Sequence, residues 1–338
     1  MSRSNRKVVL ARHPGRSLHL DDFEIVDAAA GEPEQGQVLV KVEHLGIDAF
    51  IGTTLNYDGH HGKTELQGPI MALGTGRVLA SCSSEFEVGD QVIGGMGAQQ
   101  YCIQNAVDLR KLDDIASPPR SYLGLLGMTT GLTAYAGMLL VANVQKGDTV
   151  AVSAAAGAVG TVACQLAKLR GARVIGIAGG PDKCRFLKEI GCDAAIDYKN
   201  SDVAVELRAL TPTGLDVFFD NVGGAILDSA LDNIASGARV VVCGAISQYG
   251  NLDAVQGPSL YLRLAERNAS MRGFTVDYYT EQFPMMEAEL SKWMAEGKIY
   301  LPEHIEEGIE RFPEALMKLY RGGHQGKLLV ELDSTSRG

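Results

Sequence analysis

Hydrophobic and polar positions follow two alternating patterns in the middle of the chain. Short apolar runs of strand length recur at residues 149–152, 173–178, 194–197, 216–220 and 239–242. Segments with helical spacing lie between them, such as 159–169 and 183–190. Strands that alternate with helices predict a parallel, doubly wound α/β sheet, and the continuously apolar run 239–242 suits a strand covered on both faces. A sixth strand is expected near residues 270–274.

The two ends of the chain have a different pattern. The first 125 or so residues carry short β-like runs, such as 38–42 and 76–80, separated by Gly, Pro and Asp. This favours a β-rich, barrel-like domain. An amphipathic helix at 281–296 precedes a last apolar run at 326–331, which we expect to pair back with the N-terminal domain. The predicted domains are therefore 1–125 with 300–338, and 126–299.

Composition limits the classes of partner. The 338 residues are enough for two domains, and 46% of them are hydrophobic. The net charge of −10 disfavours binding to nucleic acid or to an anionic membrane surface. No apolar run approaches the length of a membrane span, and the basic N-terminus leads into no signal-peptide core. We expect a cytoplasmic location.

The six cysteines do not form a metal-binding pattern. None of them pair at the two-to-four spacing of a structural zinc site, and most lie in apolar or helical settings. We expect buried free thiols rather than disulfides or ligands.

A turn rich in small residues follows the first strand of the middle region. Residues 150–160 read VAVSAAAGAVG, and Ala155, Gly157 and Gly160 occupy the spacing of a dinucleotide-binding fingerprint whose first glycine is replaced by alanine. Gly157 would let the backbone approach a pyrophosphate, and Gly160 would let the helix pack on the strand. The free N–H groups at the helix start would face the phosphates. A turn that serves helix packing alone is the alternative.

The end of the next strand bears on the choice of nicotinamide cofactor. Where NAD-binding chains place an acidic residue for the ribose, this chain has Gly179-Gly180, although Asp182 follows shortly. Lys183 is placed to attract the 2′-phosphate of NADPH, and a solvated lysine at a helix start is the alternative. The sequence favours NADPH as cofactor.

Five short motifs occur in the order known from one family. They read GLTAY (131–135), AAAGAVG (154–160), DNVGG (220–224), CGAISQY (243–249) and GKLLV (326–330). On these motifs the chain resembles the medium-chain dehydrogenase/reductase superfamily over nearly its whole length. Within it, the chain is most similar to zinc-independent double-bond reductases: prostaglandin reductase (leukotriene B4 12-hydroxydehydrogenase), plant alkenal reductase and bacterial curcumin reductase. The resemblance implies a Rossmann domain for NADPH, a GroES-like β-barrel built from both chain ends, and a homodimer.

The resemblance also implies which residues contact the cofactor. They are Thr133, Gly157, Ala158, Val159, Gly160, Lys183, Tyr198, Asn221, Cys243, Gly244, Ala245, Ile246, Ser247, Phe274, Thr275, Val276 and His324. Among them Tyr198 matches a phosphate contact, while Asn221 could equally belong to turn chemistry. His324 stands where the family usually has asparagine.

The substrate pocket implied by the resemblance contains Phe50, Tyr57 and Tyr249. Phe50 stands where the family often has tyrosine, so it lacks a hydroxyl that could face the pocket, and the segment 53–71 with His60 and His61 matches poorly. These departures concern the identity of the substrate more than the class of reaction.

The positions that supply zinc ligands in metal-dependent relatives carry neither Cys nor His here, at 46–48 and 73–76. His44, His60 and His61 have no nearby Cys or carboxylate cluster, so we expect no catalytic metal. A hydroxyl donor would then stabilise negative charge on the substrate oxygen. Tyr249, just past a strand end, matches the family tyrosine proposed for this role. A tyrosine that only shapes the pocket is the alternative, and the further hydroxyls of Tyr57, Tyr278 and Tyr279 have weaker claims.

The expected function is NADPH-dependent reduction of the C=C bond of α,β-unsaturated ketones or aldehydes, small molecules that receive the hydride on the β-carbon. Quinone reduction within the same superfamily is a near alternative. A non-catalytic NADPH-binding protein is an alternative of a different class.

Overall fold

The chain divides into two compact units. A computed structural model describes residues 3–15, 17–56, 59–112, 117–250 and 254–332. One unit comprises residues Met1–Gly124 and Glu303–Gly338, and the other comprises Leu125–Pro302. Each unit has its own main sheet and its own hydrophobic core.

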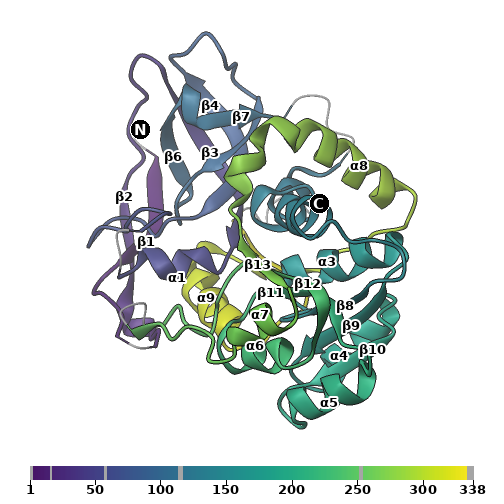
Figure 1. Ribbon diagram of the computed structural model, residues 1–338. Coiled ribbons are helices and arrows are strands. Elements are labelled where there is room, and N and C mark those ends of the chain that lie inside the picture. Colours follow the sequence, from purple (N-terminus) through teal and green to yellow (C-terminus); the bar gives the residue numbers. More distant parts are fainter. Residues whose placement is uncertain (1–2, 16, 57–58, 113–116, 251–253, 333–338) are drawn as a thin grey trace. The chain divides into compact units, whose positions relative to one another are not determined.

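The second unit is built on six parallel strands in the order β10-β9-β8-β11-β12-β13 (Figure 1). Their bounds are β8 Thr149–Val152, β9 Arg173–Ala178, β10 Ala194–Asp197, β11 Leu215–Asp220, β12 Ile234–Val242 and β13 Ser270–Gly273. This order is that of the doubly wound dinucleotide-binding fold, so the predicted α/β class is confirmed. Strand β12 begins five residues before the predicted run. The prediction missed the first half of this strand, which includes Gly237, because that half is not continuously apolar.

Helices join these strands. They are α3 Ala158–Leu169, α4 Pro181–Glu189, α5 Val203–Leu210, α6 Gly224–Leu231 and α7 Leu262–Glu266. The unit also contains η4 Met128–Leu132, α2 Thr133–Tyr135, η5 Ala136–Val141, η7 Val276–Gln282 and α8 Phe283–Ala295. The predicted helical segments 159–169, 183–190 and 281–296 correspond to α3, α4 and α8.

The core of this sheet explains why its strands could be predicted from apolar runs in the sequence. Phe218 of β11 and Val240 of β12 are partners in the register of these two strands. Both belong to one buried hydrophobic cluster, together with Ile175 of β9 and Leu207 of α5. Strands covered by helices bury both of their faces, and they therefore read as unbroken apolar runs.

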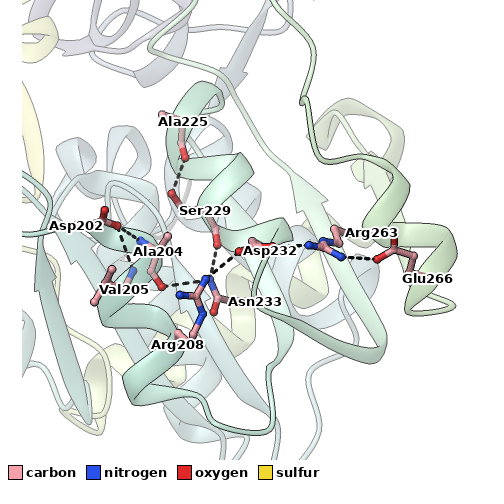
Figure 2. A network of polar contacts seen from close by, with 10 residues as sticks. All are labelled: Asp202, Ala204, Val205, Arg208, Ala225, Ser229, Asp232, Asn233, Arg263 and Glu266. Carbon is pink, nitrogen blue, oxygen red and sulfur yellow. Dashed lines mark hydrogen bonds and ion pairs between the residues drawn. The ribbon is translucent and has the colours of Figure 1, made fainter.

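A surface network joins α5, the end of α6 and α7 (Figure 2). Asp202 caps α5, because its carboxylate accepts hydrogen bonds from the N–H groups of Ala204 and Val205 at 2.9 and 3.1 Å. Asp232 accepts from both Arg208 and Arg263 at 3.0 Å. The two bonds to Asp232 hold the ends of α5, α6 and α7 together.

The first unit is mostly β-structure. Its main sheet has the order β14-β15-β3-β4-β5-β7, with β6 paired to β3, and β1 and β2 form a two-stranded sheet. The strands are β1 Ser4–Leu10, β2 Phe23–Ala29, β3 Gln37–Ile47, β4 Leu73–Ser81, β5 Gln91–Gly95, β6 Tyr101–Asn105, β7 Leu109–Lys111, β14 Glu303–Glu307 and β15 Lys327–Glu331. Short helices complete it: η1 Leu20–Asp22, α1 Phe50–Thr54, η2 Ala106–Asp108, η3 Pro119–Leu123, η8 Ile309–Arg311 and α9 Phe312–Tyr320.

The C-terminal strand returns to the N-terminal part of the chain. Strand β15 pairs antiparallel with β3, and Leu328 is the register partner of Ile47. Both side chains belong to the core of this unit, together with Phe312 of α9. The prediction that the late strand pairs back with the first domain is confirmed.

Two smaller expectations need correction. Residues Pro119–Val141 form helical segments long and apolar enough to cross a membrane, and 72% of their most apolar window is buried. The expectation that no such run exists is therefore wrong. A segment packed into a protein core can be as long and as apolar as a membrane span. The cysteines are free, but Cys82 is exposed, and only Cys102, Cys164 and Cys192 are fully buried.

Candidate active site

The sheet order places a ligand-binding edge between β8 and β11. These two strands are neighbours, although they are not consecutive in the chain, so the winding of the sheet reverses between them. In open α/β sheets ligands bind outside the carboxyl ends of the strands at such a point. Ser153 follows β8 there, and Asp220 ends β11.

The turn after β8 brings backbone and helix very close together. Ala154 has a left-handed φ of 46°, and Gly157 is the N-cap of α3. A Cβ on Gly160 would lie 2.4 Å from the Ala154 carbonyl oxygen, and one on Gly157 would lie 3.2 Å from it. Gly160 is thus required by packing, as the fingerprint predicts. Ala158, Val159 and Gly160 form the first turn of α3, where free N–H groups suit a phosphate.

The residues after β11 are fastened to the end of β8. The Asn221 amide nitrogen donates to the Ser153 carbonyl oxygen at 2.7 Å, and the Asn221 backbone N–H donates to the Ser153 hydroxyl at 2.8 Å. The Ser153 hydroxyl in turn donates to Asp220 Oδ1 at 2.8 Å. Asp220 also accepts from the N–H groups of Val222 and Gly223, so the turn chemistry weighed for Asn221 belongs to Asp220.

The loop after β12 carries Tyr249. The Tyr249 hydroxyl oxygen accepts a hydrogen bond from the Ala245 N–H at 3.1 Å. A Cβ on Gly244 would lie 2.9 Å from the same oxygen, so glycine leaves room for the phenol. Burial raises the pKa of Tyr249, while the bond from Ala245 opposes this shift. Burial also raises the pKa of Cys243 to about 12, so this thiol is protonated at neutral pH.

A cationic region lies at the ends of β9 and β10. A Cβ on Gly179 would lie 2.8 Å from the Tyr198 ring and 2.9 Å from Lys199 Cε, so these side chains lie over the glycine backbone. Burial and the neighbouring charge of Lys199 lower the pKa of Lys183. Two lysines and one phenol therefore gather where the sequence analysis expected the 2′-phosphate.

Two carboxylates lie near this region, and both have bonding partners. Asp197 Oδ1 accepts from the Gly180 N–H at 2.8 Å, and this bond, followed by those from Asn200 and Lys199, lowers the pKa of Asp197. Asp182 is exposed and pairs with Arg185 at 3.1 Å.

The remaining cofactor candidates of the second unit lie in α2, in the Tyr249 loop and after β13. Thr133 begins α2, and its hydroxyl donates to the Met128 carbonyl at 2.6 Å. Ile246 and Ser247 belong to the Tyr249 loop, where the Ser247 hydroxyl donates to the Val222 carbonyl at 2.6 Å. A Cβ on Gly137 would lie 2.8 Å from the Phe274 ring, while Thr275 and Val276 follow β13 and are half-buried.

Three predicted residues belong to the first unit. Phe50 begins α1, and its ring centroid lies 5.0 Å from that of His61. His324 lies between α9 and β15. Tyr57 lies outside the described residues. The cofactor and substrate roles assigned to these residues stay predictions.

A buried ion pair occupies the place where metal-dependent relatives carry zinc ligands. Lys327 Nζ donates to Asp48 Oδ1 at 2.6 Å, and the lysine is fully buried. A Cβ on Gly46 would lie 2.9 Å from Asp48 Oδ2. Over the described ranges there is no group of three or more His, Cys, Asp or Glu side chains able to hold a metal ion.

Several site residues escaped the sequence analysis. Ser153, Lys199 and the side chain of Asp220 all act at strand ends, and Asp197 does so at the end of β10. Their positions at the carboxyl end of an apolar run, or one or two residues after it, are the signal that could have found them. Their partners come from other strands, and a single sequence does not tell which strands are neighbours in the sheet.

Comparisons with known proteins agree with this architecture. The model of the family described as zinc-binding dehydrogenase matches residues 158–292, and that described as N-terminal domain of oxidoreductase matches residues 6–112. The chain is 37% identical to the putative NADP-dependent oxidoreductase YfmJ of Bacillus subtilis, over 99% of this chain and 100% of that protein. It is 36% identical to the NADP(+)-dependent 2-alkenal reductase of Nicotiana tabacum, over 97% of each chain. The crystal structure of CurA from Vibrio vulnificus in complex with NADPH is similar, with a TM-score of 0.91, 34% identity, and coverage of 97% of this chain and 99% of that one.

Fold, site and relatives together define an oxidoreductase of the NADP-dependent reductase type. The chain belongs to the medium-chain dehydrogenase/reductase superfamily, among the relatives of alkenal and curcumin reductases.

Proposed function

We propose that this protein uses NADPH to reduce the C=C bond of α,β-unsaturated ketones and aldehydes. The 2-alkenal reductase among its relatives supports this class of substrate. The observation that carries the proposal is the Tyr249 hydroxyl, which is anchored by the Ala245 N–H at the carboxyl edge of the sheet.

The second unit has features that fit NADPH. The first turn of α3 offers N–H groups to the pyrophosphate, Gly157 places no side chain at its N-cap, and Gly160 lets the helix pack on the turn. Lys183 and Lys199 would supply two positive charges near the 2′-phosphate. When bound, NADPH supplies the hydride.

Tyr249 would stabilise the charge that develops during conjugate reduction. Addition of hydride to the β-carbon breaks the C=C π bond and leaves an enolate on the substrate oxygen. The Tyr249 oxygen accepts from Ala245, and among the described residues none accepts a bond from its O–H, which supports donation of this hydrogen to the enolate. Burial raises the pKa of the phenol and keeps it protonated at neutral pH. Solvent then protonates the α-carbon.

The proposal is tested with a panel of substrates. The protein is mixed with NADPH and, separately, with enones, alkenals, quinones and saturated aldehydes, and NADPH absorbance is followed. We expect oxidation with enones or alkenals and none with saturated aldehydes. Oxidation with quinones alone would instead identify a quinone reductase. NADPH binding without oxidation by any compound would identify a non-catalytic binding protein.

A further inference from the structure

We propose that Asp220 is a positioning residue, whose buried carboxylate fixes the backbone on which the Tyr249 loop is held. This inference rests on the proposed function for its catalytic consequence, whereas its structural part is independent of the reaction.

The Asp220 carboxylate is the centre of a compact set of hydrogen bonds. The residue is fully buried at the end of β11. Its Oδ1 accepts from the Ser153 hydroxyl at 2.8 Å and from the Val222 N–H at 3.0 Å, and the Gly223 N–H is shared between Oδ1 and Oδ2 at 3.1 and 3.0 Å. Because a buried carboxylate is costly unless it is satisfied, these bonds strongly favour one conformation of residues 220–223.

The backbone of that same segment then holds the loop after β12. The Asp220 carbonyl oxygen accepts from the N–H groups of Cys243 and Gly244 at 2.8 and 3.1 Å. The carbonyls of the next two residues accept from the N–H groups of Ile246 and Ser247 at 3.1 and 3.2 Å. The position of the loop therefore depends on the position of residues 220–222. Within the loop, the Tyr249 hydroxyl oxygen accepts from the Ala245 N–H.

The charge of Asp220 acts on the same loop. Cys243 and Tyr249 are its titratable neighbours, and the negative carboxylate adds to burial in raising the pKa of both groups. Ionisation of Tyr249 is therefore opposed, and the phenol stays a hydrogen-bond donor. Asp220 would contribute to catalysis through Tyr249 without touching the substrate itself.

The chain contains a matched control for this role. Asp216 lies on the same strand, and its carboxylate accepts from the Thr149 N–H at 2.7 Å, at the start of β8. Asp216 and Asp220 thus each bond to β8, or to the residue that follows it, at opposite ends of β11. Replacing Asp216 tests the general cost of losing such a bond away from the Tyr249 loop.

The structural arm uses amide hydrogen exchange of the whole protein without cofactor or substrate. In Asp220→Ala we expect exchange across residues 243–249 to rise about tenfold or more, as for loss of a charge-assisted bond. Asp216→Ala should leave these residues unchanged. Asp220→Asn keeps the Oδ1 acceptor and serves if the alanine variant does not fold; it should raise the same exchange by a smaller factor. Unchanged exchange at 243–249 in a folded Asp220 variant would overturn the proposal.

The catalytic arm is a double-mutant cycle with Tyr249→Phe, assayed on an enone. In the native background Asp220→Asn should lower kcat about tenfold, with a smaller change in the KM for NADPH. In the Tyr249→Phe background the same substitution should lower kcat less than about threefold, because its effect passes through the phenol. Equal losses in both backgrounds would show a purely structural role and contradict the inference. If the native protein reduces no enone, the proposed function fails, while the exchange arm still decides the role of Asp220.

Discussion

Two groups of strand ends on one sheet surround their charged side chains differently. At the ends of β8, β11 and β12, the acid Asp220 is buried and its oxygens are used by N–H and O–H groups of the protein. At the ends of β9 and β10, burial and then the charge of Lys199 lower the pKa of Lys183, while Asp197 accepts from the Gly180 N–H. The polar groups of the first region bond to one another, whereas in the second region the half-buried ammonium of Lys183 lies near a second cation.

This difference indicates a division of labour. A region whose polar groups bond to one another is rigid and suits the positioning of a reacting hydroxyl. A pair of neighbouring cations is unfavourable alone, and a phosphate dianion placed between them relieves the repulsion. Each of the following substitutions should affect one region and spare the other.

The largest effect is expected from Tyr249→Phe. Loss of the hydroxyl should lower kcat on enones by about 10²–10³-fold, the typical loss for one oxyanion donor. The affinity for NADPH, measured by fluorescence titration, should stay within about twofold of the native value because no cationic group is removed. Native turnover in this variant would remove Tyr249 from the mechanism.

Lys183→Ala and Lys199→Ala should act on the cofactor instead. Each should weaken NADPH binding by about 1–2 kcal/mol, as for a charge-assisted contact, and should leave NADH binding nearly unchanged. The control is Lys188→Ala, because Lys188 lies on α4 with Lys183 and its ammonium donates to the Asp193 carbonyl at 2.5 Å. Equal losses for NADPH and NADH would show that these lysines do not read the 2′-phosphate.

The preference for NADPH should depend on pH. Because burial and the charge of Lys199 lower the pKa of Lys183, its positive charge is lost at a lower pH than that of an ordinary lysine. The ratio of NADPH to NADH affinity should therefore fall as pH rises through that lowered pKa. Lys183→Arg should abolish the fall, since arginine stays charged. A ratio that falls equally in both proteins would assign the titration to another group.

Metal removal should have the smallest effect. The positions around Gly46 hold the Asp48–Lys327 ion pair rather than Cys or His ligands. We expect full activity after dialysis against a chelator, and no stoichiometric zinc by elemental analysis. Activity that disappears with chelation and returns with zinc would contradict the metal-independent reading.

The sheet was more predictable from the sequence than the site was. Runs such as 149–152 and 173–178 match β8 and β9 residue for residue, because strands buried on both faces are unbroken apolar stretches. The start of β12 was missed because Ser236 and Gly237 interrupt its apolar pattern. Gly160 was predictable because only the smallest residue tolerates the approach of Ala154.

The partners of the site residues could not be read in the same way. Ser153 and Asp220 are 67 positions apart, and they meet only because β8 and β11 are neighbours in the sheet. Lys199 likewise reaches Gly179 from another strand. Such contacts depend on strand order, which local pattern does not contain.

The most direct test of the account is the fate of the hydride. NADPH deuterated at its hydride-donating carbon is turned over with an enone, and the product is analysed by NMR and mass spectrometry. The account predicts a saturated ketone with deuterium on the β-carbon, and an α-carbon proton drawn from solvent. Deuterium on the carbonyl carbon, in an allylic alcohol, would contradict it.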